Sequence, residues 1–280
     1  MFPSLKSSVI FIYINGILLS IGSIEYLTCF LVYYYYYHQI VLFLGLLSIY
    51  SIRNYLLIYL IEQGTLNKKN INDRHEINER YYGEFHLSLI TTTSIETLTH
   101  MYIYSYMAFR FDLSYSILYD LVMFIPISFL FEILFDFFHY WGHRILHHPL
   151  VYIYSHKIHH RFLRPKAITT FYQDPIDLFI TNSVPTFLGM SMIPYMSHLL
   201  FHWIIIYKNF IEISGHCGKI SYPSSSFPQC VWLPRILGIE LYTENHDMHH
   251  SINNCNYAKR FSLWDKVFGT YRQFQYETVK

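Results

Sequence analysis

The sequence predicts an all-α protein: a polytopic helical bundle in a membrane, topped by a helical cap rich in histidine. Composition is the first reason, because 52% of the 280 residues are apolar and only 14% are charged, against about 25% in an ordinary soluble domain. The second reason is the alternation of long uncharged stretches with polar loops. The third is that the polar segments carry histidines at helical spacings.

Charge and cysteine usage exclude other classes. A formal net charge of +1 gives no basis for a nucleic-acid partner. The 4 cysteines lie far apart without a CxxC pair, which is neither a disulfide framework nor a zinc ribbon. This usage is compatible with a reducing compartment.

The first half of the chain, residues 1–125, is predicted to be an N-terminal transmembrane region. From residue 9 to residue 61 the only charged or titratable interruptions other than tyrosine and cysteine are Glu25, His38 and Arg53. That length fits two passes of about 20 residues each, joined within 25–37. The tyrosines that end this join fit an interfacial aromatic belt and fit compositional bias equally well.

The remaining segments follow in order. Residues 62–84 form a polar loop, and 86–109 and 115–138 are two further apolar segments, the first weakened by threonine and glutamate. Residues 126–275 are predicted to form the catalytic region. They include a polar, histidine-rich stretch and an apolar hairpin of two short helices at 176–213.

Topology follows from the parity of these passes. Paired passes would leave the N-terminus, the 62–84 loop, the histidine segment and the C-terminal region on one side. The basic residues of those loops make this side cytoplasmic by the positive-inside rule; they are Lys68, Lys69, Arg74, Arg80, Arg144, Lys157, Arg161, Arg164, Lys166, Lys259, Arg260, Lys266 and Arg272. The histidine motifs can then meet in one place.

The histidines recur as HxxxH, HxxHH and HxxHH, and on a helix positions i, i+3 and i+4 share a face. The residues are His143 and His147, then His156, His159 and His160, then His246, His249 and His250. Eight spaced imidazoles exceed the capacity of one ion and imply a dinuclear site. Imidazole accepts zinc, iron, copper and nickel alike, so the residues alone leave the metal open. A carboxylate-bridged centre is disfavoured because only one "DFFH" occurs.

Other histidines have competing interpretations. His216, in "SGHCGK", is a candidate ninth ligand. His139 shares the helical stripe of His143 but is more simply a structural residue, and His148 points away from that stripe. His198 and His202 form another HxxxH in the apolar hairpin, where they line a cavity or bind metal.

Three carboxylates are candidates for orienting the imidazoles. Asp136 lies one helical stripe from His139 and could accept the second N–H of a ligating ring. Asp247 and Glu244 could do the same for the last motif. Surface or capping roles are the alternative for each.

These motifs resemble the fatty acid hydroxylase/sterol desaturase superfamily. The resemblance covers about residues 130–273 and is specific in "FHYWGHRILHH", "HKIHHRF", "SGHCGK" and "ENHDMHHSINNCNYAKRFSLWDKVFGTYR". The last segment is most similar to the sterol 25-hydroxylase and C4-methylsterol oxidase branches. By this resemblance the eight motif histidines would carry catalysis and bind metal, with His216 as a further metal ligand.

The resemblance implies an O2-dependent hydroxylase with two iron ions that attacks an unactivated C–H bond of a sterol or related lipid. Electrons would come from cytochrome b5 or a similar donor and its reductase, because neither a GxGxxG nor an HPGG motif occurs here. In a eukaryote the expected location is the endoplasmic reticulum membrane, as a multi-pass protein whose active site faces the cytoplasm. Residues of 176–213 would wall the substrate site.

One departure weakens the sterol assignment: Lys219 stands where these branches have tyrosine. A desaturase with the same centre is therefore kept as the alternative. A histidine-rich metal transporter is a hypothesis from another class, disfavoured because its histidines should follow a path through the membrane. A non-catalytic member is disfavoured by the intact motif.

Overall fold

The computed structural model describes residues 5–35, 38–71, 82–107, 116–162, 165–221 and 226–275. Within these ranges the chain is helical, with one isolated antiparallel bridge between Asn70 and Lys219 and no strand. The predicted all-α class is confirmed. The part of the 62–84 loop that holds Arg74 and Arg80, the end of the tyrosine run, and Arg164 lie outside the described residues.

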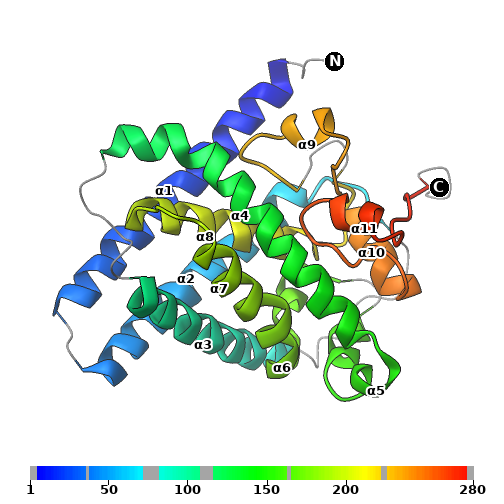
Figure 1. The fold of residues 1–280 in the computed structure, drawn as a ribbon, viewed down its shortest axis with the longest axis horizontal. Coiled ribbons are helices and arrows are strands. Elements are labelled where there is room, and N and C mark those ends of the chain that lie inside the picture. The colour runs from blue at the N-terminus through cyan, green and yellow to red at the C-terminus, as the bar shows by residue number, and fades with distance from the viewer. Residues whose placement is uncertain are drawn as a thin grey trace.

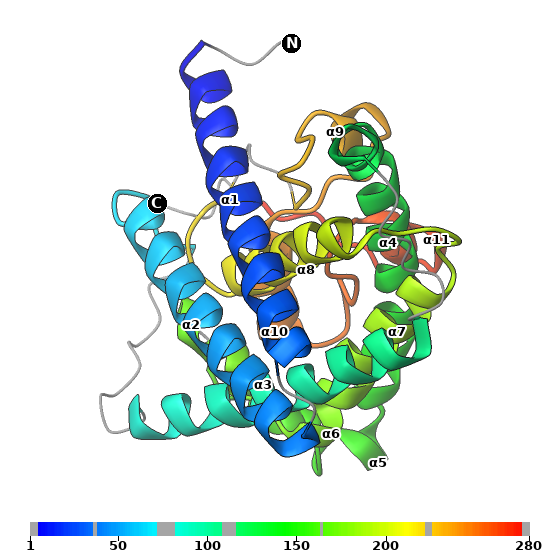
Figure 2. The same ribbon diagram turned by 90° about the vertical axis from the view of Figure 1, so that its left-hand side faces the viewer.

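The N-terminal half begins with two long apolar helices, α1 (Leu5–Tyr35) and α2 (Gln39–Thr65). They lie side by side at one edge of the molecule, in blue in Figures 1 and 2. Their outer faces are apolar and open: Ile12 is 68% exposed and Ile40 74%. Such faces are stable against lipid rather than water.

Three described helices are long and apolar enough to cross a membrane: Ile10–Tyr35, Gln39–Thr65 and Ile117–Leu146. The protein is therefore an integral membrane protein. Helix α3 (Tyr82–Met107) does not reach this hydropathy, in keeping with its threonines and glutamates. The pairing of passes and the cytoplasmic orientation both stay predictions.

Helix α4 (Ile117–Leu146) is the axis of the second half of the chain. Ser116 caps its start by accepting from the Tyr119 N–H, and it continues through Pro126 to the first histidine motif. A short helix α5 (Pro149–Tyr152) follows at once, and Pro149 occupies its first turn, where a proline costs no hydrogen bond. Pro149 thus begins a helix, and α4 has already ended.

The apolar segment after residue 175 is helical up to Ser191. It consists of α6 (Pro175–Leu178), a π-helical turn η4 (Phe179–Ser183) and α7 (Val184–Ser191). Pro185 lies in the first turn of α7, and the chain turns back only near Pro194 into α8 (His198–Ser214). Helix α7 packs on α4 and α8 packs on α1, which is the two-helix hairpin expected from the sequence.

Short elements complete the fold, and the last of them packs on α4 (Figure 1). They are the 3-10 turns η2 (His156–Arg161) and η3 (Ala167–Phe171), and the helices α9 (Leu233–Ile236), α10 (Thr243–Ile252) and α11 (Leu263–Val267). Helix α10 ends where Asn253 adopts a left-handed conformation with φ 63°. The Trp264 indole N–H donates to the Ile133 carbonyl at 3.1 Å and ties α11 to α4.

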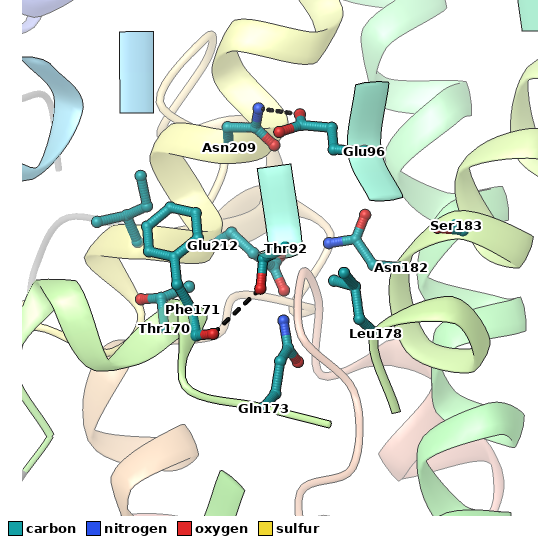
Figure 3. A pocket seen from close by; sticks show the side chains of 11 residues that line it. Thr92, Glu96, Thr170, Phe171, Gln173, Leu178, Asn182, Ser183, Asn209 and Glu212 are labelled. Atoms are coloured by element: carbon teal, nitrogen blue, oxygen red, sulfur yellow. Dashed lines mark hydrogen bonds between the residues drawn. The ribbon is translucent and has the colours of Figure 1, made fainter. Parts of the chain in front are cut away.

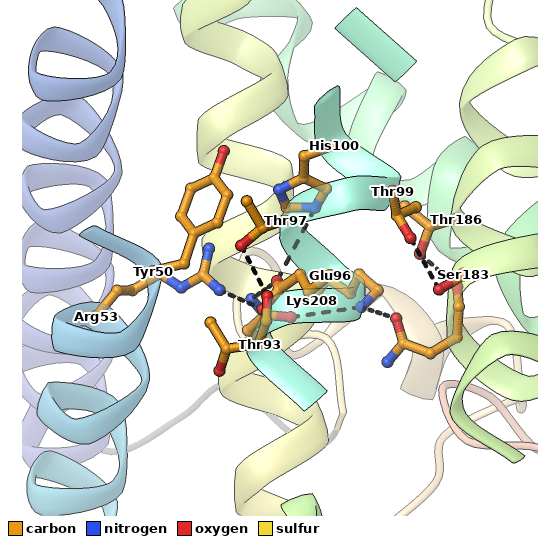
Figure 4. A network of polar contacts seen from close by, with 12 residues as sticks. Tyr50, Arg53, Thr93, Glu96, Thr97, Thr99, His100, Ser183, Thr186 and Lys208 are labelled. Atoms are coloured by element: carbon orange, nitrogen blue, oxygen red, sulfur yellow. Dashed lines mark hydrogen bonds and ion pairs between the residues drawn. The ribbon is translucent and has the colours of Figure 1, made fainter. Parts of the chain in front are cut away.

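A buried polar network joins α1, α2, α3 and α8 (Figure 4). Arg53 pairs with Glu25 at 3.2 Å and with Glu96 at 2.7 Å. Asn209 on α8 donates to the other oxygen of Glu96 at 2.7 Å. Charges inside a membrane are costly unless paired, so this network holds the four helices in one arrangement.

Candidate metal centre

Nine histidines converge at the C-terminal end of α4 in two groups. Within each group one nitrogen from every ring lies within 4.8 Å of the others. The first group is His143, His147, His156, His160 and His249, and the second is His159, His216, His246 and His250. These are the nine residues that the sequence analysis singled out as metal ligands.

The first group is built from α4, η2 and α10. The Nε2 of His156 lies 3.0 Å from that of His143 and 3.0 Å from that of His160. The Nε2 of His249 lies 3.1 Å from that of His147 and 3.2 Å from that of His160. The five rings therefore close around one point.

The second group joins η2, α10 and the turn after α8. The Nε2 of His216 lies 3.3 Å from that of His159 and 3.0 Å from that of His246. The Nε2 of His250 lies 3.1 Å from that of His246. Rings far apart in sequence thus meet at a second point next to the first.

The HxxHH motifs do not each serve one group. His156 and His160, at i and i+4, both face the first group, whereas His159 between them faces the second. In α10 the assignment is reversed, because His246 and His250 face the second group and His249 the first. In each HxxHH motif the ring at i+3 thus belongs to the other group from the rings at i and i+4, and this exchange interlocks the two groups.

Hydrogen bonds to Nδ1 orient four of the rings. His143 contacts the Tyr257 carbonyl at 2.8 Å, His249 the Cys255 carbonyl at 2.7 Å, and His216 the Glu212 carbonyl at 2.9 Å. A carbonyl only accepts, so Nδ1 carries the proton and the Nε2 lone pair of the neutral ring faces the group. These contacts are the orienting partners that metal-binding histidines use.

The fourth oriented ring is His156, whose Nδ1 lies 2.8 Å from an oxygen of Asp177. Sequence analysis missed Asp177. It lies in α6, away from the motif along the chain. The signal that could have found it is a carboxylate within the apolar hairpin of 176–213, where a charge is costly unless it is used.

Burial holds imidazoles of both groups in the uncharged form. Burial, together with the nearby Lys259 charge, lowers the pKa of His216 to about 3. Burial, reinforced by the charge of a neighbouring histidine, lowers the pKa of His147 to about 3. For His249 and His250 burial and the neighbouring rings hold the pKa well below the ordinary value. Neutral rings are the form that binds a metal ion.

The residues fit metal ions. Lone pairs of neutral imidazoles that face one another at 3.0–3.3 Å repel unless something positive lies between them. Nitrogen ligands about 2.1 Å from one ion stand at this kind of spacing from each other. Two such buried clusters side by side have the donor chemistry of a dinuclear, all-histidine site.

Asp136 does not contact an imidazole, contrary to expectation. Its Oδ1 accepts from the backbone N–H groups of Lys259 and Arg260 at 2.7 and 2.9 Å, and its Oδ2 from that of Phe261 at 3.0 Å. It therefore anchors the segment after α10 to α4. Glu244, the other carboxylate with a described contact, accepts from the Ser221 hydroxyl at 2.7 Å.

The remaining candidate histidines lie outside both groups. His139 donates its Nδ1–H to the Thr181 carbonyl, 2.7 Å away, and stacks on Phe135. His148 caps α5 by accepting from the Leu150 N–H. His202 contacts Glu25 at 2.8 Å and belongs to the buried polar network.

Two consecutive cations are buried near the centre, and the first of them, Lys259, contacts the second group. Lys259 and Arg260 are 5% and 0% exposed, so they are not the interfacial charges that the topology argument took them to be. Arg260 pairs with Glu132 at 3.0 Å and with Glu212 at 2.6 Å. The Nζ of Lys259 lies 2.9 Å from the Nε2 of His246, and burial lowers the pKa of Lys259 to about 7 against the opposing charge of Glu212.

A small cavity lies between α3, η4 and α8 (Figure 3). Its volume of about 30 Å³ holds about two water molecules and is far below the ~300 Å³ of an ordinary ligand site. Glu96, Asn209 and Glu212 line it, and the chain runs on from Glu212 to His216. It is large enough for water and too small for a lipid.

The fold and the site define a class: an integral membrane protein whose helices converge on two histidine groups suited to metal binding. The model of one family, "Fatty acid hydroxylase", matches residues 128–270, half of the chain. The chain belongs to this family, and the resemblance noted from the motifs is confirmed.

The names of the relatives describe enzymes that act on sterols or fatty acids. Methylsterol monooxygenase 1 of Rattus norvegicus is 33% identical over 52% of this chain and 46% of its own. The fatty acid hydroxylase vlmA of Lecanicillium sp is 33% identical over a match that covers 50% of this chain and 40% of the relative. The Δ(7)-sterol 5(6)-desaturase ERG3A of Gibberella zeae is 32% identical over a match that covers 55% of this chain and 39% of the relative.

The matched region thus spans less than half the length of these relatives. No solved structure matches the chain.

Proposed function

We propose that the protein is a membrane-bound, O2-dependent di-iron oxygenase that hydroxylates or oxidises an unactivated C–H bond of a sterol or related lipid. The observation that carries the proposal is the pair of interlocked histidine groups in a chain of the fatty acid hydroxylase family. All nine histidines are proposed as the metal ligands, and the eight of the three motifs as the catalytic set.

Two bound iron ions would supply the activation of O2. The chain's own residues do the rest: the Nδ1 contacts of His143, His249 and His156 hold the rings in place. Burial keeps bulk water from the centre, as His249 is 0% exposed and His156 1%. A lipid would reach the centre along the apolar faces of the bundle.

Electrons must come from outside the described chain. Cytochrome b5 or a similar one-electron carrier, supplied by its reductase, is the proposed donor. We place the active site on the cytoplasmic side of the endoplasmic reticulum membrane if the source is eukaryotic. Exposed basic residues on η2 and α11, Lys157 and Lys266, would face an acidic carrier.

Desaturation is the second candidate. Relatives of about the same identity include both methylsterol monooxygenases and Δ(7)-sterol 5(6)-desaturases. The same centre would remove a second hydrogen in place of delivering a hydroxyl. A metal transporter is disfavoured because both histidine groups lie together at one end of α4 rather than along a path.

The test is lipid profiling of cells with and without the protein. His159→Ala and His249→Ala each remove one ligand, the former from the second group and the latter from the first. Both variants should lose the new product, whereas His148→Asn should keep it, because His148 is exposed and outside both groups. A product that persists in both alanine variants would refute the proposal.

Metal analysis of the purified protein supplies an independent readout. The wild type should carry about two ions per chain, and each alanine variant fewer. A hydroxyl on the product identifies an oxygenase and a new double bond a desaturase. One ion or none in the wild type would contradict a dinuclear centre.

A further inference from the structure

The two histidine groups differ in number. The first offers five imidazole nitrogens and the second four. The second group has, in addition, one amine against it, that of Lys259. We propose that the Nζ of Lys259 is the fifth nitrogen ligand of the second metal ion, an inference that rests on the proposed metal centre.

The distances have the spacing of ligands to one ion. The Nζ of Lys259 lies 2.9 Å from the Nε2 of His246, and 3.3 and 3.4 Å from the Nδ1 and Nε2 of His216. Histidine nitrogens of this group stand 3.0 to 3.3 Å from one another. The amine is therefore as close to the Nε2 of His246 as the histidine nitrogens of the group are to each other, which is the spacing of two ligands that share one ion.

The fold directs this side chain to the second group. Asp136 on α4 accepts the Lys259 backbone N–H at 2.7 Å and fixes where the side chain begins. Gly215, next to His216, leaves the room that the side chain fills: a Cβ there would meet the Lys259 Nζ at 3.3 Å and Cε at 3.4 Å. The lysine is thus held at both ends.

Charge favours coordination over an ammonium. A divalent ion among His216, His246 and their partners would repel a positive charge at this distance. A neutral amine has a lone pair to offer instead. On binding, the N–H bond breaks, the N–metal bond forms, and the proton leaves to water.

Cobalt(II) is a suitable probe, because its visible absorption is strong in tetrahedral sites and weak at higher coordination numbers. The full-length, metal-depleted protein in detergent should bind two cobalt ions. In Lys259→Met the second ion should bind at least 10-fold more weakly. Its absorption should also strengthen, because four histidines alone form a tetrahedral site.

Lys208→Met is the matched control. Lys208 is buried like Lys259, with exposed fractions of 1% and 5%. Its Nζ, however, contacts Asn182 and Asn209 rather than a histidine. Its cobalt binding and spectrum should equal those of the wild type. Lys259→Arg keeps the charge but lacks a free amine, so it should behave as Lys259→Met does.

A measurement on the wild type avoids any folding defect of the variants. With lysine labelled by ¹⁵N at Nζ, pulsed EPR of the protein carrying two cobalt ions should detect the coupling of a directly bound ¹⁵N. Absence of that coupling would overturn the proposal.

So would a Lys259→Met protein that binds both ions as the wild type does. A wild type that binds one ion while Lys259→Met binds two would overturn it as well, because the ammonium would then replace the second ion. A wild type that binds none would refute the metal centre itself.

Discussion

At the level of single residues, the ring nitrogen that points away from the histidine groups, Nδ1, decides how four of the rings are held. The Nδ1 of His143, His216 and His249 contacts a backbone carbonyl in each case. Three of the orienting partners are thus part of the main chain, which mutation of a side chain leaves in place. The exception is Asp177, whose carboxylate orients His156.

Asp177→Ala should weaken the first metal site. The His156 ring would lose the acceptor that fixes its tautomer, and loss of such partners lowers metal affinity about 10- to 100-fold. Titration with a metal ion should find one weakened site and one unchanged, because Asp177 contacts no ring of the second group.

Asp174→Asn is the control for this prediction. Asp174 lies three residues earlier and caps α6 by accepting from the Ile176 N–H, a role that asparagine also fills. Equal affinity of both sites in Asp177→Ala and wild type would show that Asp177 only supports the fold.

Among the elements, α4 carries the closest packing. Gly142, directly before His143, lies where a Cβ would come 2.9 Å from the Ile180 carbonyl oxygen. Only a glycine lets the π-helical turn η4 approach α4 this closely. The same π-helical turn, η4, places the Thr181 carbonyl beside His139.

Gly142→Ala should therefore destabilise the protein by about 1–3 kcal/mol, the usual cost of overpacking. It should also loosen the first metal site, because α4 or η4 must shift beside His143. Thermal unfolding in detergent and metal retention after dialysis measure the two effects.

Gly16→Ala is the matched change in α1, where a Cβ would meet nothing within 4 Å. Alanine is the better helix former by about 1 kcal/mol, so this variant should be at least as stable as the wild type. If Gly142→Ala were as stable as Gly16→Ala, the close approach of η4 would not be a constraint.

Over the whole molecule, the buried charges join the membrane helices. Arg53 on α2 reaches Glu96 on α3 (Figure 4) and also Glu25 on α1. Arg53→Met should cost about 3–5 kcal/mol of unfolding free energy, because it leaves buried carboxylates without their cation. Denaturation in detergent micelles measures this loss of unfolding free energy.

Two comparisons test the reason for this loss. Glu96→Gln added to Arg53→Met should recover part of the stability, since one unpaired charge is removed. Lys68→Met, which removes an exposed cation near the end of α2, should change little. An Arg53→Met protein as stable as Lys68→Met would mean that the network contributes nothing.

Sequence by itself determined the class of fold and the residues of the candidate centre. Apolar stretches of membrane length and polar loops are local properties, so α1, α2, α4 and the hairpin could be expected from them. The histidine spacings likewise singled out eight of the nine residues of the two groups, because helical periodicity is written in the sequence, and the ninth, His216, was a candidate through "SGHCGK".

Only the tertiary structure decided how those nine rings divide. His159 and His249 leave the group of their own motif, Asp177 and Lys259 join the centre from elsewhere, and Asp136 binds backbone instead of imidazole. Each of these outcomes depends on which elements pack against the end of α4. Such contacts join residues far apart in sequence, and spacing along the chain carries no information about them.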